Sequence, residues 1–154
     1  MELSEIIGVE GVRAPLKVTS KKRLLQDLAD MAESVYGLPS ATVYKALMDR
    51  EALGPTGVGR GVAIPHARFP GVEHVTGLFV RLEKPVDFEA IDRQPVDLVF
   101  ALFAPESAGA EHLKALARVS RTLRGDAVCA KLRSTFDLSA IYAILTETKA
   151  EQPA

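Results

Sequence analysis

The chain has 154 residues, and its three histidines are the side chains best suited to nucleophilic chemistry near neutral pH. His66 follows Pro65, which stiffens the backbone at the end of a predicted strand. A histidine in such a turn is commonly a solvated surface residue. Here Arg68 lies two positions later and Arg60 lies just before the strand. These guanidinium groups favour an anion beside the imidazole.

The other two histidines have different settings. On the predicted third helix, His112 shares one face with three apolar residues, Leu116, Val119 and Leu123. It is therefore either a buried core histidine or a group that faces a second histidine across a cleft. His74 opens a predicted strand, and we expect it on the surface.

The glycine-rich segment 54–61 does not fit a nucleotide-binding loop. A P-loop requires a lysine and a hydroxyl residue at its end and a strand before it, whereas this segment ends in Arg60 and Gly61 and follows a helix. Two interpretations remain open. The segment is a tight helix-to-strand connection that uses glycine for positive φ, or its amides at Gly57 and Gly59 add to an anion site with Arg60 and Arg68.

Metal and thiol chemistry have little support in the sequence. The chain lacks the His-x-His, His-Glu-x-x-His and Cys-x-x-Cys spacings of zinc sites. Its single cysteine, Cys129, lies between apolar residues of a predicted helix and is expected to be a small core residue. We therefore expect no zinc site.

The composition bounds the class of protein and its partners. Nineteen basic side chains balance twenty acidic ones, so no overall field attracts a polyanion. The basic residues of the third helix, Lys114, Arg118 and Arg121, fit a solvated face, and we expect no nucleic-acid partner. Because the sequence has no signal peptide and no long apolar run, we expect a cytoplasmic protein without membrane insertion.

Helices and strands alternate along the chain, with prolines and glycines at their boundaries. The spacing of apolar residues predicts helices over 20–36, 40–53, 110–123, 126–132 and 138–148, and strands over 61–64, 75–82 and 96–104. The first two helices have Ser20 and Ser40 as predicted caps. The run 96–104 is the most hydrophobic, and it predicts a central strand buried on both faces. The sequence thus predicts a single α/β domain over 1–154, with a core over 10–148 and a frayed tail over 149–154. A mixed sheet is covered by helices on both faces.

Three separated motifs stand in a characteristic order. They run from Asp49-Arg50-Glu51 through Thr56–His66, then over Ala90-Ile91-Asp92-Arg93-Gln94-Pro95-Val96-Asp97-Leu98, then Glu111-His112-Leu113. Together they closely resemble the IIA proteins of the bacterial phosphoenolpyruvate-dependent phosphotransferase system. Within that system the chain resembles the fructose–mannitol class, and most of all its stand-alone nitrogen-regulatory members. The resemblance covers about residues 10 to 148.

The resemblance implies a role for each matching residue. His66 matches the histidine that accepts a phosphoryl group, His112 matches the second active-site histidine, and Arg50 matches the arginine of the phosphorylation site. The sequence departs from the family at Ala67, where glycine is common, and at Arg60, where asparagine is often found. The family implies a histidine phosphocarrier protein as donor, downstream regulatory proteins as targets, and no cofactor.

Elementary chemistry agrees with this interpretation, because phosphoryl transfer asks a protein mainly for positioning and for stabilisation of charge. A phosphohistidine that exchanges its phosphoryl group with another protein must be accessible to that protein. We therefore expect His66 in a shallow depression ringed by apolar residues. Two alternatives remain. One is a sugar-specific IIA component that passes phosphate to a IIB domain, and the other is an interaction module that has lost phosphotransfer.

Overall fold

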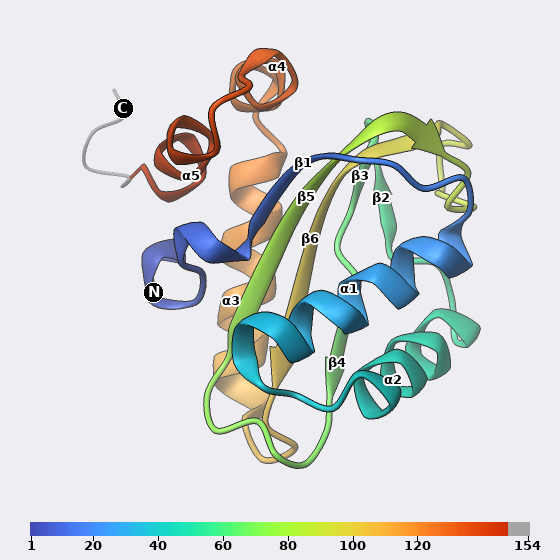
Figure 1. Cartoon of the computed structure of the whole chain (residues 1–154), viewed down its shortest axis with the longest axis vertical. Coiled ribbons are helices and arrows are strands. Elements are labelled where there is room, and N and C mark those ends of the chain that lie inside the picture. The colour runs from blue at the N-terminus through green and yellow to red at the C-terminus, as the bar shows by residue number, and fades with distance from the viewer. Residues whose placement is uncertain (148–154) are drawn as a thin grey trace.

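A mixed β-sheet lies between two layers of helices in the computed structural model, which describes residues 1–147 (Figure 1). The strands follow the order β1-β5-β6-β3-β2, and β4 also pairs with β6. Their bounds are Val12–Leu16 for β1, Gly57–Gly59 for β2, Val62–Ala63 for β3, His66–Arg68 for β4, Thr76–Val86 for β5 and Val96–Ala104 for β6. The predicted α/β class with a mixed sheet is confirmed. The predicted tail lies outside the described residues.

One edge of β6 carries two short parallel strands in succession. In β3, Val62 is paired with Leu98, and in β4, His66 is paired with Leu102. Between them the ladder is interrupted at Pro65, which has no N–H to donate, although its carbonyl accepts the N–H of Leu102 at 2.9 Å. The sequence predicted His66 in a turn after the strand. Instead, His66 begins a second strand segment, because the pairing with β6 resumes after the proline.

Five α-helices cover the sheet and match the predicted ones within a few residues: α1 Lys21–Tyr36, α2 Ser40–Ala52, α3 Gly109–Leu123, α4 Asp126–Ser134 and α5 Leu138–Thr146. Two short 3-10 helices, Leu3–Glu5 and Val9–Gly11, precede β1. Ser20 caps α1 as predicted, since its hydroxyl accepts the N–H of Arg23 at 3.1 Å. None of the helices in the described part of the chain is both long and apolar enough to span a bilayer.

The predicted cap of α2 is wrong. Ser40 is the first residue of that helix, and Pro39 occupies the cap position. The N–H of Ser40 is satisfied by the carboxylate of Glu33 on α1 at 3.0 Å, and its hydroxyl donates to Asp30 at 2.7 Å. A contact from the neighbouring helix therefore replaces the local cap.

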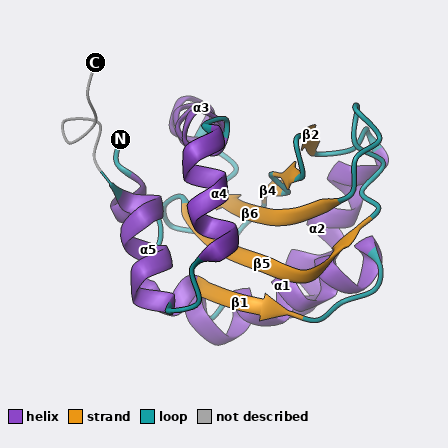
Figure 2. Cartoon of the chain, turned by 90° about the horizontal axis from the view of Figure 1, so that it is seen from above, coloured by secondary structure: helices purple, strands orange, loops and turns teal. Residues whose placement is uncertain are grey.

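The sheet is buried on both faces, as the hydrophobic run in β6 predicted. Figure 2 shows α1 and α2 on one side of the sheet and α3, α4 and α5 on the other. Successive residues of β5 enter different cores, with Leu78 packed in the cluster of α1 and Phe79 packed in the cluster of α3. This packing fixes the sheet as a rigid base for the strands at its edge.

Besides β4, two other strands were not predicted. β1 is a short edge strand that contains a proline and buries only Val12 fully. β2 lies within the glycine-rich segment and forms a hairpin with β3. Arg60 and Gly61 form its turn, with φ of 58° and 78°. The segment is therefore a β-hairpin with left-handed turn residues, and the interpretation as a connection that uses glycine for positive φ is the better of the two.

The close packing of β5 on β6 leads to a stability prediction. A Cβ added at Gly77 would lie 2.6 Å from Cε1 of Phe100 and 3.3 Å from the carbonyl oxygen of Ala101. Gly77→Ala should therefore lower the free energy of unfolding by about 1–3 kcal/mol, measured by urea denaturation. Gly109→Ala is the matched control, because no described atom beyond its own neighbourhood lies within 4 Å, and it should leave stability unchanged or raised. Equal midpoints for the two variants would contradict this packing.

Candidate functional site

His66 and Arg50 meet where α2 runs beside β4. The guanidinium Nε of Arg50 donates to Nε2 of His66 at 3.3 Å. Nη1 of the same guanidinium donates to the carbonyl of Gly54 at 2.9 Å, just beyond the end of α2. Both side chains are half-buried. Arg50 is therefore held at two points, with its charge beside the imidazole.

The two ring nitrogens of His66 have partners that select one tautomer. Nδ1 lies 2.9 Å from the carbonyl oxygen of Ile64, which can only accept, so Nδ1 carries the proton. Nε2 faces the Nε–H of Arg50, which can only donate, so Nε2 presents its lone pair. Both contacts agree on the neutral Nδ1–H imidazole. Nε2 is thus the nucleophilic nitrogen.

Burial lowers the pKa of His66, and the nearby charge of Arg50 lowers it further. The carbonyl of Ile64 and the carboxylate of Glu51 act in the opposite direction without reversing the shift. His66 is therefore neutral at physiological pH. A neutral imidazole keeps the lone pair that a nucleophile needs.

His112, in the first turn of α3, faces His66 across the site. The ring centroids are 5.4 Å apart and the ring planes are inclined by 50°. His112 is only 7% exposed, and its Nδ1 is buried without a hydrogen-bond partner among the described residues. Burial, then the charges of His66 and Arg68, lower its pKa to about 4. The two interpretations from the sequence combine, since His112 is both buried and opposite a second histidine.

These residues line one open depression of about 470 Å³. Arg50, His66, Arg68, His112 and Asp49 supply its polar groups, and the carboxylate of Asp49 is paired with Lys45 at 2.8 Å. The apolar lining residues are Ala46, Leu53, Ala67, Leu113 and Leu116. Leu53, at the C-terminal end of α2, is 85% exposed, and Leu113, on α3, is 67% exposed. An apolar rim around a cationic floor agrees with the depression expected for a histidine that a protein partner reaches.

Of the residues suggested for an additional anion site, only Arg68 lines the depression. Gly57, Gly59 and Arg60 are not among the described residues that line the depression, whereas Arg68 is. The guanidinium of Arg60 is paired with Asp126 of α4 at 3.0 Å. The backbone N–H of Arg60 donates to Asp92 at 2.8 Å. Arg50 and Arg68 are thus the cations that the fold brings to the histidines.

The backbone carbonyls of the site were missed by sequence reasoning. The carbonyls of Ile64 and Gly54 orient His66 and Arg50, yet a carbonyl carries no signal in the residue type. Only the break that Pro65 places in the strand hinted that backbone groups are free to bind side chains there.

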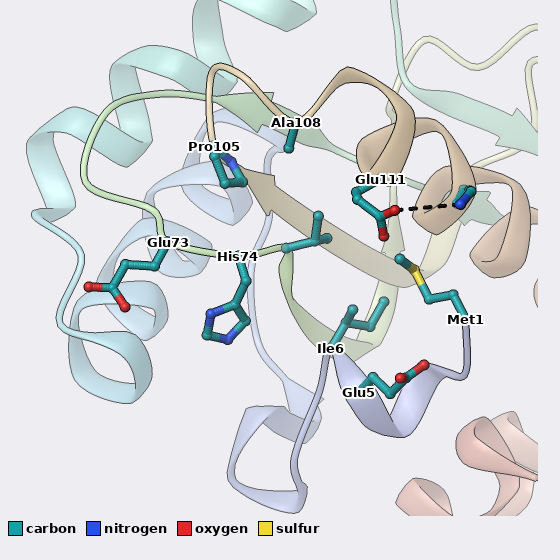
Figure 3. A pocket seen from close by; sticks show the side chains of 10 residues that line it. Met1, Glu5, Ile6, Glu73, His74, Pro105, Ala108 and Glu111 are labelled. Carbon is teal, nitrogen blue, oxygen red and sulfur yellow. Dashed lines mark hydrogen bonds and ion pairs between the residues drawn. The ribbon is translucent and has the colours of Figure 1, made fainter.

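The third histidine lies in a separate depression of about 480 Å³, between the N-terminus and the loop before α3 (Figure 3). His74 is exposed, as expected, and Glu73 and Glu111 lie on opposite sides of that depression in Figure 3. Across residues 1–147, no group of three or more histidine, cysteine or carboxylate side chains is arranged to hold a metal ion. His66 and His112 therefore share one depression, and His74 lies in another.

The electrostatics of His112 lead to a pH prediction. The unfolded histidine binds a proton near its ordinary pKa of 6.5, whereas the folded one binds it only near pH 4. Between these values the unfolded state holds more protons, so this group reduces the stability of the fold as pH falls from 6.5 to 4. An NMR titration of the ring protons should give a pKa for His112 of about 4, and His112→Gln should lose this part of the pH dependence. Titration of His112 near 6.5 would contradict the buried setting.

Comparison with known proteins agrees with the fold. Residues 5–148 match the family model described as phosphoenolpyruvate-dependent sugar phosphotransferase system, EIIA 2. A nitrogen regulatory protein of Bradyrhizobium diazoefficiens is 50% identical over 145 residues, which are 94% of this chain and 95% of the relative.

Two solved structures share the architecture. The nitrogen regulatory protein IIA-Ntr from Neisseria meningitidis superposes with a TM-score of 0.89 and 38% identity, over 94% of this chain and 99% of that one. The mannitol IIA of Escherichia coli shares the fold at a TM-score of 0.77 and 21% identity, over 90% of this chain and 97% of that one. Because the family model spans nearly the whole chain, the protein belongs to the EIIA 2 family of the phosphoenolpyruvate-dependent phosphotransferase system.

Proposed function

We propose that this protein is a phosphoryl carrier that accepts a phosphoryl group from a histidine phosphocarrier protein onto Nε2 of His66. Its phosphorylation state then controls which regulatory proteins it binds. The observation that carries the proposal is the fixed tautomer of His66, whose nucleophilic nitrogen faces the open depression beside Arg50. Membership of the family supports the general activity.

The transfer step follows from this geometry. The lone pair of Nε2 attacks the phosphorus of the donor's phosphohistidine in line, forming a new N–P bond. The donor's N–P bond breaks, and its electron pair returns to the donor imidazole. The proton on Nδ1 of His66 stays in its hydrogen bond to Ile64, where it stabilises the positive charge that forms on the ring. The reverse sequence hands the group to a later acceptor.

The cationic floor of the depression suits the transferring group. The hydrogen bond from Arg50 to Nε2 of His66 breaks as the phosphoryl group arrives. The guanidinium of Arg50 then binds the equatorial oxygens of that group. Arg68 adds a second charge at the rim. His112 remains neutral at physiological pH and donates an N–H without adding a competing positive charge that would weaken the nucleophile.

The relatives favour a regulatory role over sugar transport. The Bradyrhizobium relative is named a nitrogen regulatory protein and matches along almost its whole length. The Neisseria structure carries the same designation and the same fold. We therefore place this chain in the nitrogen-type branch, and a sugar-specific IIA component is the alternative that the donor test must exclude.

The central test is transfer of labelled phosphate. The protein is incubated with labelled phosphoenolpyruvate, enzyme I and the phosphocarrier protein, and a phosphate that is labile in acid and stable in base should appear. His66→Ala should take up no label, because the substitution removes the proposed nucleophile. His74→Ala, a histidine in the separate depression, is the matched control and should label like the wild type. Labelling of His66→Ala would refute the assignment.

His112 should affect the rate and not the fold. His112→Ala removes a neutral N–H donor beside the transferring group, so uptake or onward transfer should slow by roughly 100-fold. Circular dichroism and the unfolding midpoint at pH 7 show whether the variant remains folded. Full activity in a folded His112→Ala protein would show that His112 serves only the core.

The branch of the phosphotransferase system is tested with two donors. Uptake should be faster from a nitrogen-type phosphocarrier than from a sugar-type one, and no phosphate should pass to a fructose- or mannitol-type IIB domain. Uptake from the sugar-type carrier followed by passage to IIB would instead support the sugar-specific alternative.

A further inference from the structure

A buried carboxylate lies directly behind the site. Glu51 follows Arg50 on α2, and its side chain is only 6% exposed. Nζ of Lys21, on α1, lies 2.7 Å from its Oε2, and Lys21 also donates to the carbonyl of Phe88 at 3.4 Å. A carboxylate so far from water requires such a partner, because an unpaired buried charge is costly. Glu51 is thus a fixed anchor between the two helices.

Glu51 binds one residue through both of its oxygens. Oε2 accepts the backbone N–H of Thr56 at 3.2 Å, and Oε1 accepts the hydroxyl of the same residue. Thr56 is almost fully buried and precedes β2. Two hydrogen bonds from one carboxylate fix both the position and the orientation of Thr56.

From Thr56, two short routes lead to the catalytic side chains. The carbonyl of Thr56 accepts the N–H of Ile64 at 3.0 Å, and the carbonyl of Ile64 accepts Nδ1–H of His66 at 2.9 Å. Gly54 lies two residues before Thr56, and its carbonyl accepts Nη1–H of Arg50 at 2.9 Å. Both acceptors that orient the site thus belong to backbone held by the same carboxylate.

We propose that Glu51 and Thr56 form a positioning unit that sets the tautomer of His66 and the orientation of Arg50. The unit touches neither the phosphoryl group nor the donor, and it acts through the carbonyls of Ile64 and Gly54. This inference rests on the proposed function for its effect on transfer. The effect of the Glu51–Thr56 unit on the imidazole is a property of the unphosphorylated protein, so it can be tested without any phosphoryl transfer.

The expected loss in the rate of uptake follows from the precise geometry that in-line transfer requires. A displacement of about 1 Å in a reacting group can cost 100-fold in rate. If the carbonyl of Ile64 shifts, the preference for the Nδ1–H tautomer weakens, and a fraction of molecules carries its proton on Nε2. Those molecules lack the nucleophile. Loss of the unit should therefore lower the rate of uptake by about 10- to 100-fold in a protein that remains folded.

The test uses substitutions that keep shape and remove hydrogen bonds. Thr56→Val removes only the hydroxyl, Thr56→Ser keeps it, and Glu51→Gln removes the charge at nearly constant volume. The 15N chemical shifts of the His66 ring report the tautomer without any phosphate donor, and labelled uptake reports the rate. The wild type should show Nδ1 protonated. Thr56→Val and Glu51→Gln should shift both nitrogens towards a mixture of tautomers and slow uptake, whereas Thr56→Ser should restore both readouts.

Glu83→Gln is the control, because it removes a carboxylate of an exposed ion pair with Lys17, 3.7 Å apart, outside the depression. It should change neither readout. The proposal is overturned if Thr56→Val has wild-type ring shifts and uptake, or if it only lowers the unfolding midpoint. Should Glu51→Gln fail to fold, Thr56→Val and Thr56→Ser decide the question. A wild type that takes up no phosphate would refute the proposed function, while the ring shifts would still decide the positioning role.

Discussion

The hydrogen bond from Nδ1 of His66 to the carbonyl of Ile64 determines which imidazole nitrogen faces the depression. That carbonyl is free for a side chain because the ladder along β6 is interrupted between β3 and β4. The interruption is tolerated because β6 itself is buried on both faces and pairs with β5 along its other edge. The interruption between β3 and β4 therefore leaves the carbonyl of Ile64 available to orient the imidazole of His66.

The charges around this bond suit the anionic phosphoryl group that we propose is transferred to Nε2. Burial and Arg50 keep His66 neutral before transfer, and burial keeps His112 neutral beside it. An anion at Nε2 reverses the situation, because the same guanidinium that disfavours a protonated ring then neutralises the bound oxygens. Glu51 lies behind this arrangement with its charge already paired to Lys21, so it holds the backbone without competing for Arg50.

Much of the fold could be predicted from the sequence, because its signals are local. The period of apolar residues defined α1 and α3, and the uninterrupted run over 96–104 defined the central strand. β1, β2 and β4 were not predicted because such short strands carry little hydrophobic pattern and form only through their pairing partners. The cap of α2 was misassigned because its donors and acceptors lie on α1.

The candidate site likewise has features that the sequence predicted and features that it did not. Residue types marked His66, and the motifs marked Arg50 and His112, which the fold brings together. The pairing of Arg60 with Asp126 could not be predicted, because the two residues lie 66 positions apart in the sequence. The roles of Ile64, Gly54 and Thr56 depend on backbone carbonyls, whose direction follows from the path of the chain and not from residue type.

The proposed transfer depends most on which imidazole nitrogen becomes phosphorylated. NMR of the 15N-labelled phosphoprotein measures this directly, through the ring shifts and the coupling between phosphorus and nitrogen. The structure predicts phosphate on Nε2 of His66, with Nδ1 still protonated and bound to Ile64. Phosphate on Nδ1 of His66, or on either nitrogen of His112, would contradict it.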